Sequence, residues 1–202
     1  LGLAGAFAAA VAGTVQRDPK TVLAYSTVSQ MGLMTTGVGV VLWQPAAASA
    51  LLPALAVYAL HHGLAKGALF LGSVVAPGAA RRSALAWGGM LVPALAIAGA
   101  PLTSGAAAKA LYKDALGADA AVLVALIAVA AIGSTALMAR FAWLARPGTA
   151  EAGSRADAAV WAGWLALVVL VAGLAWWLPA VAPVAGKALA PPSWPGQLWP
   201  IA

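Results

Sequence analysis

The chain of 202 residues contains no cysteine and few charged residues. Without cysteine it cannot form a disulfide, activate a thiolate or hold a sulfur-ligated cluster. With only five acidic residues and two histidines, it is also poor in the other common metal ligands, so we expect no metal site and no cofactor. Charged residues make up 8% of the chain, against about a quarter of a soluble domain. This scarcity of charge excludes an ordinary soluble domain.

Apolar residues, in contrast, are abundant and occur in long runs. They make up 63% of the chain, and the mean hydropathy is +0.94. Several runs exceed the roughly 20 residues that span a hydrocarbon core as a helix. The runs are rich in alanine and leucine and lack the two-residue alternation of a lipid-facing barrel strand. We therefore predict an all-α integral membrane protein.

The net charge of +6 comes from basic residues that are scattered along the chain. No basic stripe is present, so we expect the chain to contact the lipid bilayer and to bind no nucleic acid. No signal peptide is recognisable. The first residue is leucine inside an apolar run, which leads us to expect a piece of a longer polypeptide.

Prolines, glycines and charged residues divide the chain into about seven helical segments. Asp18 is a natural N-cap, and Pro19 takes the favoured first helical position. The segment 100–119 combines proline, glycine and two lysines. This combination predicts a broken or re-entrant helix near Pro101–Lys109. The tail after Pro179 is rich in proline and tryptophan, and we expect it on the membrane surface. The expected segments are 1–15 (truncated at its start), 20–43, 46–75, 84–100, 100–119 (interrupted), 120–145 and 158–178.

The strongest functional signal is "YALHHGLAKGALF", Tyr58–Phe70, an apolar run that carries two histidines and a lysine. A bilayer core penalises a charged side chain by about 2.5–3.5 kcal/mol. Tyr58, His62 and Lys66 follow one another at intervals of four residues and therefore share one helix face. His61 points about 100° away from that face. His62 and Lys66 lie near the middle of the span, about 6 Å apart along its axis.

This chemistry suits a proton relay. Imidazole titrates near neutrality, and a buried lysine can release its proton, so both groups can exchange protons at physiological pH. The alternative is a set of polar side chains that hydrogen-bond to neighbouring helices. For a stacked histidine and lysine in mid-membrane we favour the relay.

Other polar residues allow two interpretations each. Lys109 follows a break whose free backbone groups admit water or an ion, or it is an interfacial lysine that reaches the headgroups. Lys20 lies at a helix junction and is open to the same two interpretations. In "YSTVSQ", Tyr25–Gln30, the polar groups hydrogen-bond across helices or hold water.

Three stretches in this order resemble the antiporter-like membrane subunits shared by respiratory complex I, membrane-bound hydrogenases and Mrp-type Na+/H+ antiporters. They are "RDPKTVLAYSTVSQMG" (Arg17–Gly32), "HHGLAKGALFLGS" (His61–Ser73) and "GAPLTSGAAAK" (Gly99–Lys109). The final two spans match the family only in hydropathy.

The resemblance implies a role for each of the basic side chains. Lys20 resembles the lysine that connects two half-channels, His62 and Lys66 fall on the central hydrophilic axis, and Lys109 matches the broken-helix lysine at the exit. We expect the supporting polar residues to be Tyr25, Ser29, Tyr58 and His61. The implied division is a second-repeat half-channel over 1–119, followed by C-terminal helices and a surface tail over 120–202.

The same resemblance implies proton translocation within a multisubunit complex of a bacterial inner membrane. The partners would be other membrane subunits and the missing N-terminal half or a companion chain. The alternatives are a non-conducting scaffold and a membrane module that energises a soluble partner, such as an inorganic-carbon uptake enzyme or an oxidoreductase. No nucleophile–base set or nucleotide loop is present, so we expect no catalysis on this chain.

Overall fold

The computed structural model describes residues 1–76, 80–147 and 156–198, and within these ranges all regular secondary structure is helical. Three stretches are long and apolar enough to cross a membrane: Pro45–Val75, Ala121–Leu144 and Ala158–Ala180. The predicted all-α membrane fold is therefore confirmed. The helices are α1 (Gly2–Thr14), α2 (Pro19–Trp43), α3 (Ala48–Val75), α4 (Ala80–Ala98), α5 (Ser104–Leu116), α6 (Ala121–Leu144), α7 (Ala158–Val181), α8 (Pro183–Leu189) and α9 (Trp194–Leu198).

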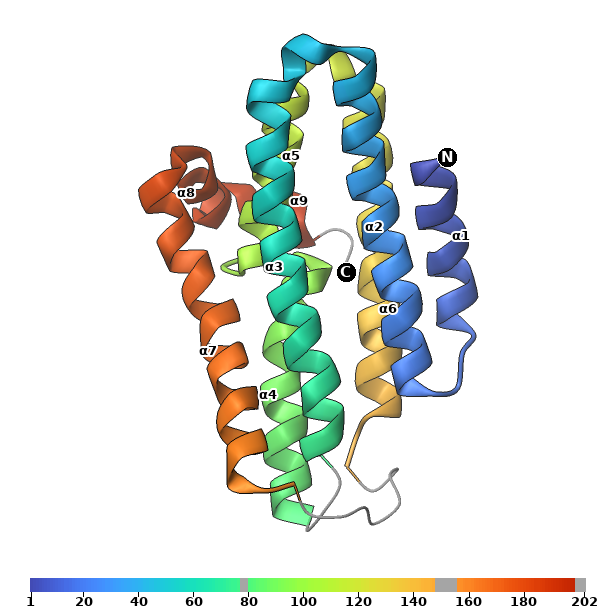
Figure 1. Ribbon diagram of the computed structural model, residues 1–202, viewed down its shortest axis with the longest axis vertical. Coiled ribbons are helices and arrows are strands. Elements are labelled where there is room, and N and C mark those ends of the chain that lie inside the picture. Colours follow the sequence, from blue (N-terminus) through green and yellow to red (C-terminus); the bar gives the residue numbers. More distant parts are fainter. Residues whose placement is uncertain (77–79, 148–155, 199–202) are drawn as a thin grey trace.

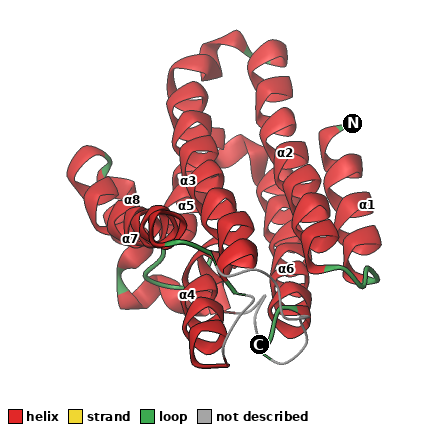
Figure 2. Cartoon of the chain, turned by 60° about the horizontal axis from the view of Figure 1, so that its bottom comes forward, coloured by secondary structure: helices red, strands yellow, loops and turns green. Residues whose placement is uncertain are grey.

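Helix α3 forms the centre of the bundle. It packs against α2, α4, α5 and α7, while α6 lies against α2 and α4 (Figure 1). Helix α1 packs against α2 and α6 and lies at the side of the bundle away from α7 (Figures 1 and 2). The polar side chains of α3 therefore meet different helices according to the face that carries them.

The start of α2 follows the sequence closely. Pro19 opens the helix, and the Asp18 carboxylate accepts hydrogen bonds from the Thr21 hydroxyl and backbone amide, each 2.7 Å long. The hydrogen bond from the Thr21 hydroxyl, and to a lesser extent that from the amide, holds the pKa of Asp18 below its ordinary value. The predicted N-cap is thus confirmed.

Small residues allow α1 and α2 to approach closely. A Cβ on Gly32 would lie 2.5 Å from the Gly2 carbonyl oxygen, and one on Gly13 would lie 2.6 Å from the Tyr25 Cβ. Glycine contacts of this kind are typical of packed membrane helices. Tyr25 is therefore half-buried against α1.

The predicted helix interruption is confirmed, but it is shorter than expected. Helix α4 ends at Ala98 and α5 begins at Ser104, so the two follow one another along α3 with a break at 99–103 (Figure 1). Gly99 has a φ of +89° and Leu102 a φ of 63°, in the left-handed region that an α-helix excludes. Thr103 then caps α5, accepting a hydrogen bond from the Ala106 amide. Because of this cap, the helix restarts before Lys109.

The C-terminal tail differs from the expected surface segment. Helix α7 continues through Pro179 to Val181, and α8 then packs against α5 (Figure 1). The sequence did not predict this contact. The division into 1–119 and 120–202 stays a prediction.

Candidate functional site

The candidate site consists of buried polar side chains from four helices. They come from α2, α3, α5 and α6, and among the described residues no aspartate or glutamate is buried with them. Uncharged apolar side chains surround them, so each polar group needs a partner inside the protein or from water. The buried polar residues are Ser26, Ser29, Gln30, His61, His62, Lys66, Ser104, Lys109 and Ser134.

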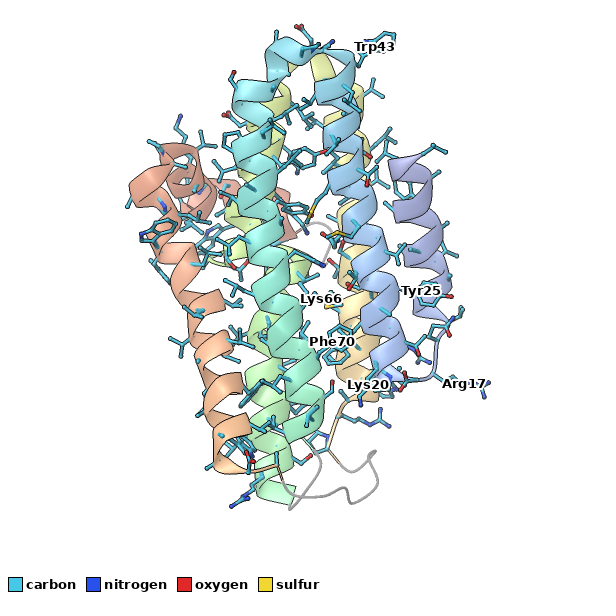
Figure 3. The ribbon with its side chains drawn as sticks, viewed as in Figure 1. Arg17, Lys20, Tyr25, Trp43, Lys66 and Phe70 are labelled. Atoms are coloured by element: carbon cyan, nitrogen blue, oxygen red, sulfur yellow. The ribbon has the colours of Figure 1, made fainter. Side chains whose placement is uncertain are left out.

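One face of α3 forms hydrogen bonds with α2. The Lys66 Nζ donates a hydrogen bond of 2.7 Å to the Leu23 carbonyl oxygen, so Lys66 reaches from α3 toward α2 (Figure 3). Two turns earlier, the Tyr58 hydroxyl donates to the side-chain carbonyl of Gln30. The Gln30 amide nitrogen in turn donates to the Ser134 hydroxyl of α6. These bonds join α2, α3 and α6 through polar side chains.

Between the Lys66–Leu23 and Tyr58–Gln30 hydrogen bonds lie residues with buried polar atoms that have no protein partner. These atoms are the Nε2 of His62 and the hydroxyl oxygens of Ser26 and Ser29. His62 shares the helix face of Tyr58 and Lys66, at the level between them. On α2, both serines likewise lie between the residues that Lys66 and Tyr58 contact. The register of the two helices therefore places these three residues at about the same height along α2 and α3. Buried groups of this kind are commonly satisfied by ordered water.

Lys109 caps the C-terminal end of α4. Its Nζ donates hydrogen bonds to the carbonyl oxygens of Ile97 and Ala98, at 2.9 and 2.8 Å. These are the last residues of α4, where free carbonyls and the negative end of the helix dipole favour a cation. The side chain is 8% exposed, so Lys109 is held inside the protein.

A cavity of about 350 Å³ lies beside the break. Lys109 and Lys113 line it from α5, and Lys187 lines it from α8. Lys109 therefore contacts the carbonyls of α4 and also borders a space large enough for water.

The comparison with known proteins decides the family. The family model described as "NADH:quinone oxidoreductase/Mrp antiporter, TM" matches residues 1–133. The chain belongs to this family of antiporter-like membrane subunits. The predicted resemblance is confirmed.

A solved structure supports the same assignment for this antiporter-like chain. The chain is similar to one in the "Structure of Mrp complex from Dietzia sp. DQ12-45-1b", with a TM-score of 0.71 and 25% sequence identity. The match covers 93% of this chain and 22% of that chain, so the antiporter-like chain spans about a fifth of the length of the chain it matches. A search of curated proteins finds no match.

The fold brings most of the predicted site residues of the antiporter-like chain into its interior. Tyr58, His61, His62 and Lys66 on α3 are buried, as are Ser29 on α2 and Lys109 on α5. Two predicted residues lie elsewhere. Lys20 is exposed near Arg17 at the start of α2, and Tyr25 lies against α1 (Figure 3).

Sequence reasoning did not identify three of the polar partners. Ser104 contacts His61, Ser134 contacts Gln30, and the Tyr112 hydroxyl donates a 2.9 Å hydrogen bond to the Leu33 carbonyl oxygen. Ser134, next to Thr135, offered the clearest signal, since the two hydroxyl residues stand in a largely apolar segment. Ser104 and Tyr112 could not be paired from the sequence, because their partners lie on other helices.

Proposed function

We propose that this chain conducts protons as a membrane subunit of a larger ion-translocating complex in a bacterial inner membrane. The observation that carries the proposal is the row of buried ionisable groups His61, His62, Lys66 and Lys109 inside a membrane bundle. Ionisable residues at such depth are costly and typically mark ion or proton pathways.

Water would connect these groups. The unpartnered atoms of Ser26, Ser29 and His62 mark the place of a proposed water compartment near Lys66, and water held there would satisfy them and carry a proton along the helix face. The cavity next to Lys109 provides an aqueous end to this path.

Lys20 would provide the opposite end of the path. It is exposed and lies three residues before Leu23, whose carbonyl accepts the hydrogen bond of Lys66. A proton taken up at this end of α2 would pass from Lys20 through water to Lys66.

The chemistry favours protons over Na+. Sodium is a hard cation that prefers carboxylate and carbonyl oxygens, and the described part of the chain buries no carboxylate. Charged lysines repel Na+, whereas lysine and histidine can each bind and release a proton. Any Na+ movement by the complete assembly would then depend on another subunit.

The partners would be other membrane subunits, as in an Mrp complex, and the part of the antiporter-like fold that this chain does not span. A non-conducting scaffold is the second candidate, because Lys66 and Lys109 each have backbone carbonyl partners that would also stabilise a static bundle. Proton flux separates the two proposals, since a scaffold needs no exchange of protons.

The first test removes the hydroxyls of the proposed water compartment. We expect the double substitution Ser26→Ala and Ser29→Ala to lower proton flux several-fold, because an apolar compartment no longer holds the water. The complete complex would be reconstituted into proteoliposomes, and flux driven by an imposed membrane potential would be followed with a pH-sensitive dye inside.

Thr135→Val is the matched control. Its hydroxyl bonds to the Ala131 carbonyl of its own helix, so its removal should leave flux unchanged. Wild-type flux in the double variant would contradict the proposed compartment, and absence of proton movement in the wild-type complex would contradict the proposed function itself.

A further inference from the structure

The two adjacent histidines of α3 have different surroundings. His62 shares a face with Lys66 and has an unpartnered Nε2. His61 points away from that face, toward α5, where its Nδ1 lies 2.9 Å from the Ser104 hydroxyl oxygen. Both atoms of this pair belong to buried residues, with His61 2% and Ser104 0% exposed. His61 is thus the histidine that contacts the helix break.

The backbone at the break approaches this imidazole very closely. A Cβ on Gly105 would overlap the Ala96 carbonyl oxygen of α4 and would lie 3.0 Å from the Nε2 of His61. The end of α4, the start of α5 and the His61 ring therefore meet at one point. Glycine at position 105 leaves room for this arrangement.

Lys109 lies one turn after Gly105 on the same side of α5. Its Nζ is at the break, bonded to the last carbonyls of α4. The His61 ring lies 6.4 Å from that of Tyr58, whose hydroxyl bonds to α2, while its Nδ1 faces Ser104 at the start of α5. His61 therefore lies between the polar groups that face α2 and the start of the helix that carries Lys109.

Resting on the proposed function, we propose that His61, together with the Ser104 hydroxyl, passes protons between the α3 relay and Lys109 across the helix break. Neutral imidazole with its proton on Nε2 accepts a hydrogen bond at Nδ1 from Ser104. As Ser104 receives a proton from water, it gives its own proton to Nδ1. The ring then releases the Nε2 proton toward the break, where Lys109 is the next buried group that can accept it.

One proton enters and one leaves in this step, so the net charge of the ring is unchanged. Before a second proton can pass, the ring has to recover the Nε2–H tautomer by rotating and exchanging its proton with water, since reversing the transfer would return the first proton. Asparagine at this position would keep a hydrogen-bonding group near the place of Nδ1, but it cannot take up and release protons. A purely structural role for His61 therefore survives His61→Asn, whereas proton transfer does not.

The experiment measures proton flux of the complete complex in proteoliposomes for His61→Asn, Ser104→Ala and Lys66→Met. We expect His61→Asn to lower flux by about 100-fold, which is the lower end of what a positioned proton-transfer group contributes. Ser104→Ala should lower flux several-fold. The assembly and thermal stability of the complex with His61→Asn should match the wild type, a result that a merely structural effect would not produce.

The outcomes separate this inference from the function on which it rests. If Lys66→Met abolishes flux while His61→Asn conducts like the wild type, the role of His61 is wrong and the proposed function stands. If neither substitution affects flux, or the wild-type complex moves no protons, the proposed function fails as well. Should His61→Asn not assemble, Ser104→Ala decides, and wild-type flux in that variant overturns the inference.

Discussion

Replacing Lys66 with methionine is expected to abolish proton movement by the complex while leaving the complex assembled. Methionine is unbranched and similar in length, and it brings no charge into the apolar interior. The Leu23 carbonyl loses the lysine but keeps the hydrogen bond that it accepts from the Thr27 hydroxyl. Exchanging a buried charge for an apolar side chain is often neutral or stabilising. Flux should nevertheless fall by at least about 100-fold, because a proton-transfer group is lost.

The control for this substitution is Arg82→Met near the start of α4, where the side chain is exposed, and this variant should conduct normally. Proton and Na+ movement would be recorded in the same proteoliposomes with the complete complex. A variant Lys66→Met that assembles and still moves protons at the wild-type rate would favour the scaffold. Loss of Na+ movement with unchanged proton movement would show that the assignment of the ion is wrong.

Among the glycines that the structure describes, Gly105 is the one whose replacement by alanine is expected to be most disruptive. The added Cβ overlaps the Ala96 carbonyl oxygen, and this obstacle is backbone, so no side-chain rotation relieves it. Overpacking of this kind costs about 1–3 kcal/mol and occasionally more. Because α4, α5 and His61 meet here, a shift would also disturb the His61–Ser104 contact. We expect a lower midpoint of thermal unfolding and a loss of proton flux together.

Gly88→Ala is the matched control, since Gly88 also lies in a helix beside the break, α4, but nothing stands within 4 Å of the place where its Cβ would be. Alanine is the better helix former by about 1 kcal/mol, so this variant should be at least as stable as the wild type. Both variants would be compared by thermal unfolding of the purified complex. Equal midpoints for Gly105→Ala and the wild type would contradict the close approach at the break.

Several features follow from local physical chemistry, and the sequence alone therefore determined them. The long apolar runs required helices in a membrane. Asp18 and Pro19 marked the start of α2, and the four-residue spacing placed His62 and Lys66 on one face. Proline and glycine near position 101 predicted the break, although the Thr103 cap that ends it was not recognised.

Tertiary structure alone decided which neighbour each polar face meets. Helical periodicity relates the directions of His61 and His62 to each other, but it carries no information about the helix that lies opposite. The contact of His61 with Ser104 and the reach of Lys109 back to Ile97 depend on how α4 and α5 overlap at the break. The position of Lys20 at the exposed start of α2 depends likewise on which helices cover that end. These relations join residues far apart in the chain, and only the packing of whole helices brings them together.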